Sequence, residues 1–123
     1  MASLKATINL NTVDATSDTL RINNTVDLTT GVPSVNIARI EVATDAATNL
    51  LTAAANTSVT YVYLKNTSTD SSHILVVKDD AGNAFSDLGS GESIFLPVKG
   101  GVGLECQASG AAITVEYGYW TKA

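Results

Sequence analysis

Hydrophobic and polar residues alternate along most of this chain with a period of two. Near the N-terminus Leu4, Ala6, Ile8 and Leu10 share one side, while the residues between them are polar. Successive side chains of a β-strand point to opposite faces, so this alternation is typical of a strand with one covered face. Residues 1–12 therefore predict an N-terminal strand or arm.

The next segments of the first half continue the pattern. Short alternating stretches occur at 20–22 and 26–28, separated by two asparagines, and again at 37–42. Residues 45–56 interrupt the alternation with several alanines, which favour helix. Because threonine and asparagine interrupt this segment, we expect a loop or a single helical turn there, with Leu50 and Leu51 closing the end of the core.

The second half predicts more strands, separated by turns rich in glycine. Residues 59–65 are apolar on both faces, as in a central strand. Gly82 lies in an Asp-Ala-Gly-Asn segment that predicts a hairpin turn with glycine at positive φ. Pro97 marks the edge or the end of its strand, because proline has no N–H to donate. Further strands are expected at 73–78, 85–88, 93–98, 102–108 and 113–120.

These elements predict an all-β protein. About eight short strands with turns between them, in a chain of 123 residues, are typical of one antiparallel β-sandwich. We expect a jelly-roll-like sandwich over residues 13–123, preceded by the strand or arm at 1–12.

The composition narrows the possible partners. Charged residues make up only 15% of the chain, and the net charge is −5 with seven basic residues. So few lysines and arginines cannot neutralise a row of phosphates, and an acidic protein is repelled by anionic lipid, so we expect neither nucleic acid nor membrane as partner. The N-terminus lacks the apolar stretch of a signal peptide, and we expect synthesis in a cytoplasm without secretion.

Candidate catalytic residues are few. His73 is the only histidine and Cys106 the only cysteine, so neither a zinc site nor most nucleophilic schemes can be assembled. Asp70, Ser71 and Ser72 neighbour His73 only along the chain. Cys106 shares a face with apolar neighbours and predicts a buried thiol. We expect no catalytic residues, no metal, no cofactor and no enzymatic activity.

Two weaker motifs have simpler explanations. The segment 79–87 contains three aspartates and an asparagine, but it lacks the spacing and the final glutamate of a calcium loop. Asn23, Asn56 and Asn66 each begin an Asn-x-Ser/Thr sequence, which is expected by chance in a chain rich in these residues.

The aromatic residues of two predicted strands are candidates for an interface. Tyr61 and Tyr63 share one strand face, as do Tyr117 and Tyr119, with Trp120 on the opposite side. Such side chains are favoured at protein interfaces and at sugar-binding surfaces. Packing within the sandwich, a protein–protein interface and a carbohydrate site all remain open for them.

Several segments together resemble small virion proteins of tailed bacteriophages. They are Tyr61-Val-Tyr-Leu-Lys-Asn66, the apolar strand 74–77, Leu88-Gly-Ser-Gly-Glu-Ser-Ile-Phe-Leu-Pro97 and Val115-Glu-Tyr-Gly-Tyr-Trp120. The resemblance covers residues 59–120 and includes head decoration, or cement, proteins. It implies a jelly-roll-like domain without a cofactor, assembled as a symmetric oligomer on the outside of a capsid and bridging capsid subunits.

From this resemblance we expect a homodimer or homotrimer that binds the major capsid protein and is located on the virion surface. The arm is an interface candidate through Leu4, Ile8 and Leu10, which pair either with a neighbouring subunit or within their own sheet. The alternative functions are a carbohydrate- or receptor-binding module and a structural component of the tail or neck.

Overall fold

The computed structural model describes residues 2–13, 20–31 and 37–123, which form ten strands and no helix. The described residues thus contain no helix long and apolar enough to cross a membrane. The strands are β1 (Ala2–Thr12), β2 (Leu20–Thr30), β3 (Ala38–Val42), β4 (Thr48–Leu51), β5 (Thr60–Asn66), β6 (Ile74–Asp79), β7 (Ala84–Leu88), β8 (Ser93–Val98), β9 (Leu104–Ser109) and β10 (Ile113–Thr121).

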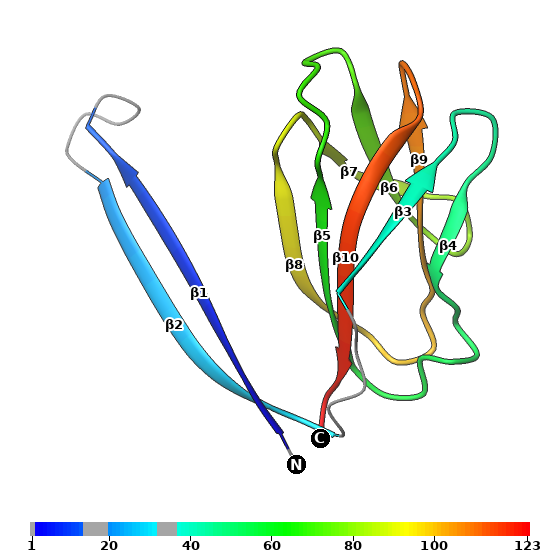
Figure 1. Ribbon diagram of the computed structural model, residues 1–123. Helices are drawn as coiled ribbons and strands as arrows, with labels where there is room; N and C mark the ends of the chain where they lie inside the picture. Colours follow the sequence, from blue (N-terminus) through cyan, green and yellow to red (C-terminus); the bar gives the residue numbers. More distant parts are fainter. Residues whose placement is uncertain (1, 14–19, 32–36) are drawn as a thin grey trace.

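Strands β3 to β10 form two four-stranded antiparallel sheets that pack face to face (Figure 1). The strand orders are β3-β10-β5-β8 in one sheet and β4-β9-β6-β7 in the other. This interleaved order, with successive strands mostly changing sheet, is that of a jelly roll. The all-β, jelly-roll-like sandwich expected from the sequence is therefore confirmed.

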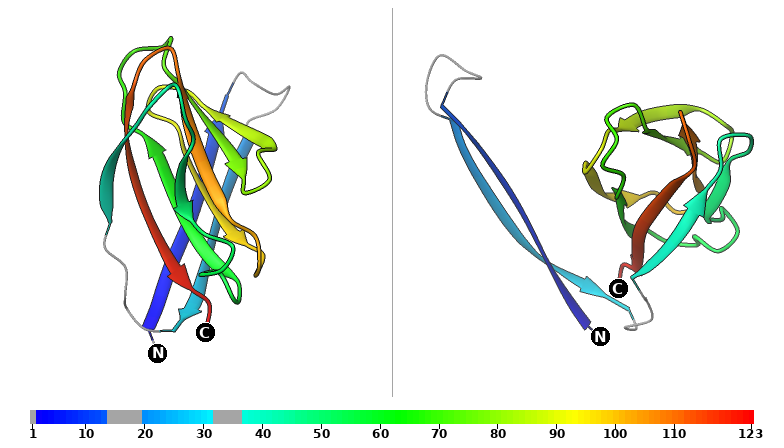
Figure 2. Two further views of the ribbon diagram at one scale, coloured as in Figure 1. Left: turned by 90° about the vertical axis from the view of Figure 1, so that its right-hand side faces the viewer. Right: turned by 45° about the horizontal axis from the view of Figure 1, so that its top comes forward.

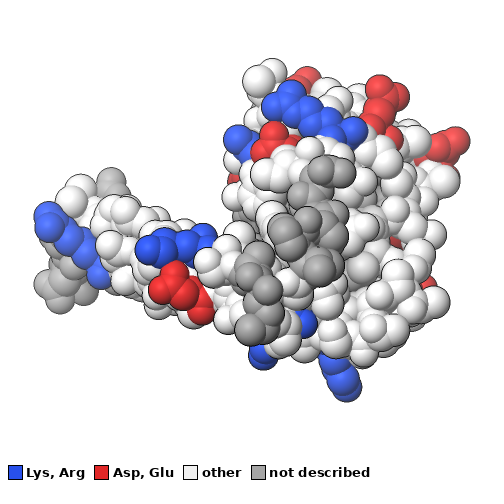
Figure 3. All heavy atoms as spheres, turned by 60° about the horizontal axis from the view of Figure 1, so that its bottom comes forward, with Lys and Arg blue, Asp and Glu red and all other residues white. Residues whose placement is uncertain are grey.

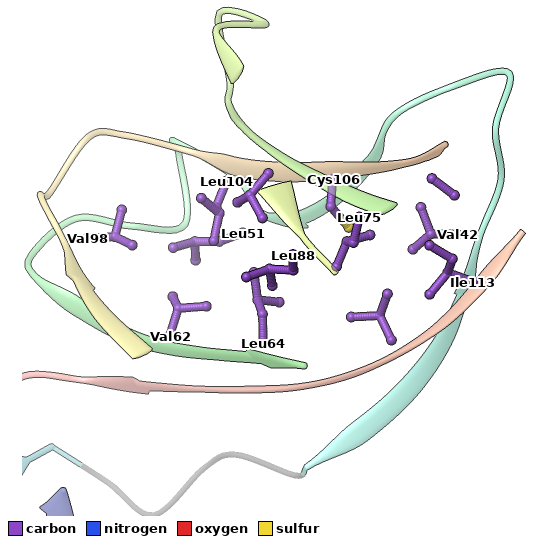
Figure 4. Close-up of a cluster of buried hydrophobic side chains, with 13 residues drawn as sticks. Val42, Leu51, Val62, Leu64, Leu75, Leu88, Val98, Leu104, Cys106 and Ile113 are labelled. Atoms are coloured by element: carbon purple, nitrogen blue, oxygen red, sulfur yellow. The ribbon is translucent and has the colours of Figure 1, made fainter. Parts of the chain in front are cut away.

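The core lies between the two sheets, where the inward residues of each strand interdigitate (Figure 4). Leu64 and Val115 from one sheet meet Leu75 and Val77 from the other, and all four are fully buried. Alternation in the sequence produces this arrangement directly, because every second residue of a strand points inward. Cys106 is part of the same core, as expected. Burial raises the pKa of its thiol to about 12.

The turn between β6 and β7 has the predicted form. Gly82 adopts φ 86°, a conformation that L side chains rarely adopt. The carboxylate of Asp79 accepts hydrogen bonds from the backbone N–H groups of Ala81 and Asn83, each at 2.9 Å. A local carboxylate thus satisfies the N–H groups that the turn leaves free.

Two expectations from the sequence are wrong in detail. Residues 48–51 are a strand, β4, instead of a loop or helical turn, and they pair with β9. The pairing gives the backbone groups at one edge of β9 hydrogen-bond partners and places Leu51 in the core. These gains outweigh the weak helix propensity of the alanines. β2 also continues through Asn23 and Asn24, because both residues pair with β1 along an unbroken register.

β1 and β2 form a hairpin of their own, separate from both sandwich sheets. It projects from one end of the sandwich as a long arm (Figures 1 and 2). Eleven pairs join its strands, from Ala2↔Thr30 to Thr12↔Leu20. The expected boundary at residue 12 therefore falls between two paired strands, and the arm extends to the end of β2.

The base of this arm is tied to the C-terminal end of the chain. The N–H of Gly31 donates to the carbonyl of Thr121 at 2.8 Å, and the N–H of Ala123 donates to the carbonyl of Thr29 at 3.0 Å. Thr30 forms a bridge with Lys122 between them and is buried. These contacts set the direction in which the hairpin leaves the sandwich.

Candidate interaction surface

The hairpin has one apolar and one polar face. Residues opposite each other in an antiparallel pair share a face, and the pairs Leu4↔Leu28 and Leu10↔Ile22 place aliphatic side chains together. Ala6↔Val26 and Ile8↔Asn24 lie on the same face between them.

The polar face of the hairpin is held by its own side chains. The hydroxyls of Thr7 and Thr25 are 3.1 Å apart, and Lys5 Nζ lies 3.9 Å from the Asp27 carboxylate. Both contacts are exposed to solvent and contribute little to stability. The polar face is thus the solvated side of the arm, and the apolar face is the candidate interaction surface.

Much of the apolar face is exposed in this chain. The exposed fractions are 49% for Ile8 and 51% for Leu10, and Ile22 and Val26 are exposed as well. Figure 3 shows positively and negatively charged side chains on the arm among residues that are uncharged. An isolated two-stranded hairpin is marginally stable in water, and a continuous apolar strip of this kind marks an interaction site.

The sandwich presents an aromatic surface on the outer face of the sheet β3-β10-β5-β8. Tyr61 and Phe95 stack there with ring centroids 6.0 Å apart and planes inclined by 17°. Trp120 is the cross-strand partner of Tyr61, and both point away from the core. Tyr61 itself is only 4% exposed, so its neighbours cover it although it lies outside the sandwich core.

Gly118 makes room for Trp120 on this face. A Cβ atom at Gly118 would lie 3.2 Å from the far end of the Trp120 indole and 3.6 Å from the Ile37 side chain. Glycine at this position therefore lets the indole and Ile37 lie over β10. Trp120 is half-buried, whereas Ile37 is exposed.

A small polar network borders the aromatic surface. The Tyr63 hydroxyl donates a hydrogen bond to Glu116 Oε1 at 3.2 Å, and Arg39 Nη2 lies 3.2 Å from Glu116 Oε2. Burial, the hydrogen bond to Glu116 and the negative charge of that carboxylate raise the pKa of Tyr63. Tyr63 is thus oriented with its ring toward the aromatic surface and its hydroxyl at the border.

The hairpin and the aromatic surface face each other across a groove of about 790 Å³. One wall is formed by the first half of the hairpin, including Leu4, Ile8 and Leu10. The opposite wall is formed by the sheet, including Tyr63, Phe95 and Trp120. Two apolar surfaces are therefore opposed but not in contact.

Six of the eight interface residues expected from the sequence surround this groove or support its wall. They are Leu4, Ile8, Leu10, Tyr61, Tyr63 and Trp120. The other two lie elsewhere. Tyr117 packs against the sandwich core, and Tyr119 lines a separate small cleft beside Leu50 and Leu51.

Phe95 and the apolar residues of β2 contribute to the same region and were not expected from the sequence. Phe95 lies in an alternating strand between Ser93 and Pro97, so strand parity alone places it on the outer face. Ile22 and Val26 show the same alternation as β1, but pairing of β1 with β2 cannot be deduced from it.

The loop before β6 brings a serine, a histidine and an aspartate together. Ser68 Oγ lies 2.9 Å from His73 Nδ1, and the Asp70 carboxylate lies 3.4 Å from His73 Nε2. Ser68 is not one of the serines considered from the sequence. Its Oγ also accepts the N–H of Asp70 at 3.1 Å.

These contacts explain how the loop holds its shape. Asp70 further accepts two hydrogen bonds from Ser72, which lower the pKa of the carboxylate. Neither groove described above is lined by Ser68 or His73. We interpret the cluster of Ser68, Asp70 and His73 as a structural one, which stabilises the conformation of this loop.

The remaining sequence motifs also have structural roles. Asn56 and Asn66 are buried, and their side chains are fully hydrogen-bonded to neighbouring strands and turns, so neither side chain is accessible in the folded chain. The Asp79 carboxylate accepts a hydrogen bond from the turn that follows it. Within the described ranges, no group of three or more His, Cys, Asp or Glu side chains is placed to hold a metal ion.

Comparison of the chain with protein-family models, with curated proteins and with solved structures finds no match, so its residues and their geometry alone bear on its function.

Proposed function

We propose that this chain is a structural virion protein of a tailed bacteriophage, which binds the outside of the capsid and bridges capsid subunits as a decoration protein. The hairpin carries the proposal, because it holds an apolar face outside a sandwich that already has a complete core. An exposed apolar face of this kind is typical of a surface that contacts another protein.

The sandwich suits a role as a rigid module on a lattice. Its core is closed, its described turns are short, and its surface has few charges to desolvate. Many copies on a symmetric shell can together resist internal pressure even if each contact is weak. We propose other copies of the chain and the major capsid protein as its partners, and the capsid surface as its location.

We also propose that the chain has no catalytic role. A serine–histidine–aspartate site needs an accessible nucleophile beside a substrate cleft. Here the Ser68 hydroxyl and both ring nitrogens of His73 are engaged in holding one loop. This use of the side chains accounts for their geometry without chemistry.

A carbohydrate-binding module is the second candidate, because half-exposed Trp120 and Phe95 form one wall of the groove. Sugars stack on such rings, but they also need polar groups around their hydroxyls. The opposite wall is largely aliphatic, with Leu4, Ile8 and Leu10. An aliphatic wall favours a protein partner over a sugar. This preference is the same whether the chain is located on the head, the tail or the neck of the virion.

The test compares phage particles made with and without this chain. We expect mass spectrometry to find the chain in purified virions and electron microscopy to show its density on the outer capsid surface. Particles that lack it should release DNA at a lower temperature. Re-addition of purified protein should restore both density and heat resistance, and the His73→Ala variant should do so equally well.

Three outcomes would count against the proposal. Absence of the chain from purified particles would exclude a virion role, and density on the tail would replace the head by the tail as its site. Loss of the restoring effect in a folded His73→Ala variant would point to an active site. Binding to a glycan array that Trp120→Ala abolishes would favour the carbohydrate function instead.

A further inference from the structure

We infer that the apolar face of the hairpin docks on the aromatic surface of a second copy of this chain, so that two copies exchange their arms. This inference deepens the proposed function by naming a second copy of the chain as the partner that binds in the groove. Only the location of that dimer on a virion rests on the proposed function. The two surfaces it joins are both present in each chain and already face each other.

The hairpin and the sheet of this chain have chemically complementary surfaces. The hairpin offers flexible aliphatic side chains such as Ile8 and Leu10, and the sheet offers the flat rings of Phe95 and Trp120. The charged side chains next to the two surfaces have partners of opposite charge: Arg39 pairs with Glu116, and Lys5, which also lines the groove, pairs with Asp27. Contact between them therefore buries apolar area without stranding a charge.

The hairpin is not packed against its own sheet. The groove of about 790 Å³ separates the hairpin from its own sheet. The hydrogen bonds from Gly31 to Thr121 and from Ala123 to Thr29 tie the base of the arm to the end of β10. These hydrogen bonds hold the base of the arm in its present direction, which leaves its apolar face apart from its own sheet and open to a second copy.

The surface area that an exchange of arms covers is that of a stable dimer. A strand rises about 3.4 Å per residue and neighbouring strands are about 4.8 Å apart, so one face of this hairpin covers roughly 350 Å². In a reciprocal exchange two hairpin faces and two receiving surfaces are covered, about 1,400 Å² in all. Stable and specific interfaces bury about 1,200–2,000 Å². Exchange of one structural element between identical subunits is a common route to such dimers.

Chemical crosslinking tests whether the contact is made between copies. One batch of the full chain carries Ile8→Cys on the arm, and a second batch of different mass carries Phe95→Cys on the sheet. After mixing, a short bismaleimide should give covalent heterodimers. Asn9→Cys, on the polar face of the same strand, should give far fewer, and the wild-type chain, with its buried Cys106, should give none.

Analytical ultracentrifugation of the purified protein measures the strength of self-association. The wild-type chain should sediment as an oligomer. Replacing both Ile8 and Leu10 with aspartate should weaken self-association by roughly ten-thousandfold, since two buried aliphatic side chains are lost from each chain and four from the dimer. The matched change of Asn9 and Asn11 to aspartate, on the polar face and outside the groove, should weaken it less than tenfold. Circular dichroism and melting temperature verify that the sandwich is intact in both variants.

The inference is overturned if the wild-type chain is a monomer at all concentrations. It is also overturned if a chain with both cysteines crosslinks only within itself, or if charges on the apolar face leave the oligomer unchanged. These experiments use the purified chain alone. An oligomer that exchanges arms but is absent from virions would refute the virion role and leave this inference standing, and a monomer found on capsids would do the reverse.

Discussion

The side-chain amide of Asn66, at the end of β5, donates a hydrogen bond to the carbonyl of Leu88, at the end of β7 in the other sheet, at 2.9 Å. The same amide group donates to the carbonyl of His73, and its oxygen accepts the N–H of Ser68. One fully buried side chain thus satisfies three backbone groups and joins the two sheets at one end of the sandwich.

Replacement of Asn66 by alanine should therefore be costly. Two buried carbonyls and one N–H would lose their hydrogen-bond partner. Leaving one buried polar group without its partner costs about 1–3 kcal/mol. We expect the free energy of unfolding to fall by about 3 kcal/mol in urea titrations. The exposed Asn49 on β4 provides the control, since Asn49→Ala should change stability by less than about 0.5 kcal/mol. Equal effects of the two changes would contradict this role of Asn66.

Two glycines at positive φ should respond differently to alanine. Gly110 has φ 99°, and a Cβ there would lie 2.6 Å from the carbonyl oxygen of Ser72. Gly82 has φ 86°, and a Cβ there would meet nothing within 4 Å. Gly82→Ala adds backbone strain alone, about 1 kcal/mol. Gly110→Ala adds a clash with backbone and should cost clearly more, which thermal or urea unfolding of the two variants will measure.

The Cys106 thiol should make stability depend on alkaline pH. Its pKa is raised from 9.0 to about 12 in the folded chain because burial disfavours the thiolate. Its contribution to stability is thus fully present below pH 9, decreases as the unfolded thiol ionises, and is lost by about pH 12. A shift of this size corresponds to up to about 4 kcal/mol.

Comparison with Cys106→Val isolates this effect, since tyrosine ionisation is common to both proteins. Between pH 9 and 11 the free energy of unfolding of the wild-type chain should fall more steeply than that of the variant. In native protein the thiol should react with Ellman's reagent only as fast as the chain unfolds. Parallel pH profiles, or rapid modification of folded protein, would show that the thiol is accessible.

Removal of residues 2–28 should separate the stability of the sandwich from self-association. The core cluster begins at Val42, so no core contact is lost, while the short tie between Thr29–Gly31 and the C-terminal end is kept. We expect a melting temperature within a few degrees of the full-length value and a monomer in sedimentation. Outright unfolding would mean that the hairpin belongs to the folding unit of the sandwich.

The local pattern of side chains was enough to predict the class of this fold and most of its strands. Strand periodicity depends on which side chains point inward, and that information is local, so the central strand β5 and the turn at Gly82 were both predictable. The buried state of Cys106 follows from the same parity. β4 was not predictable, because its alanine-rich neighbourhood has no clear local preference and only pairing with β9 makes it a strand.

Which strands pair, and with that where the candidate interaction surface lies, depends on contacts that no local pattern encodes. The same alternation in β1 and β2 is compatible with strands of the sandwich or with a separate hairpin. Tyr61 and Tyr117 likewise carry equal signals in the sequence, yet one lies under an aromatic surface and the other against the core. Pairing joins residues far apart in the chain, and a periodicity of two identifies the two faces of a strand but never the neighbour that covers them.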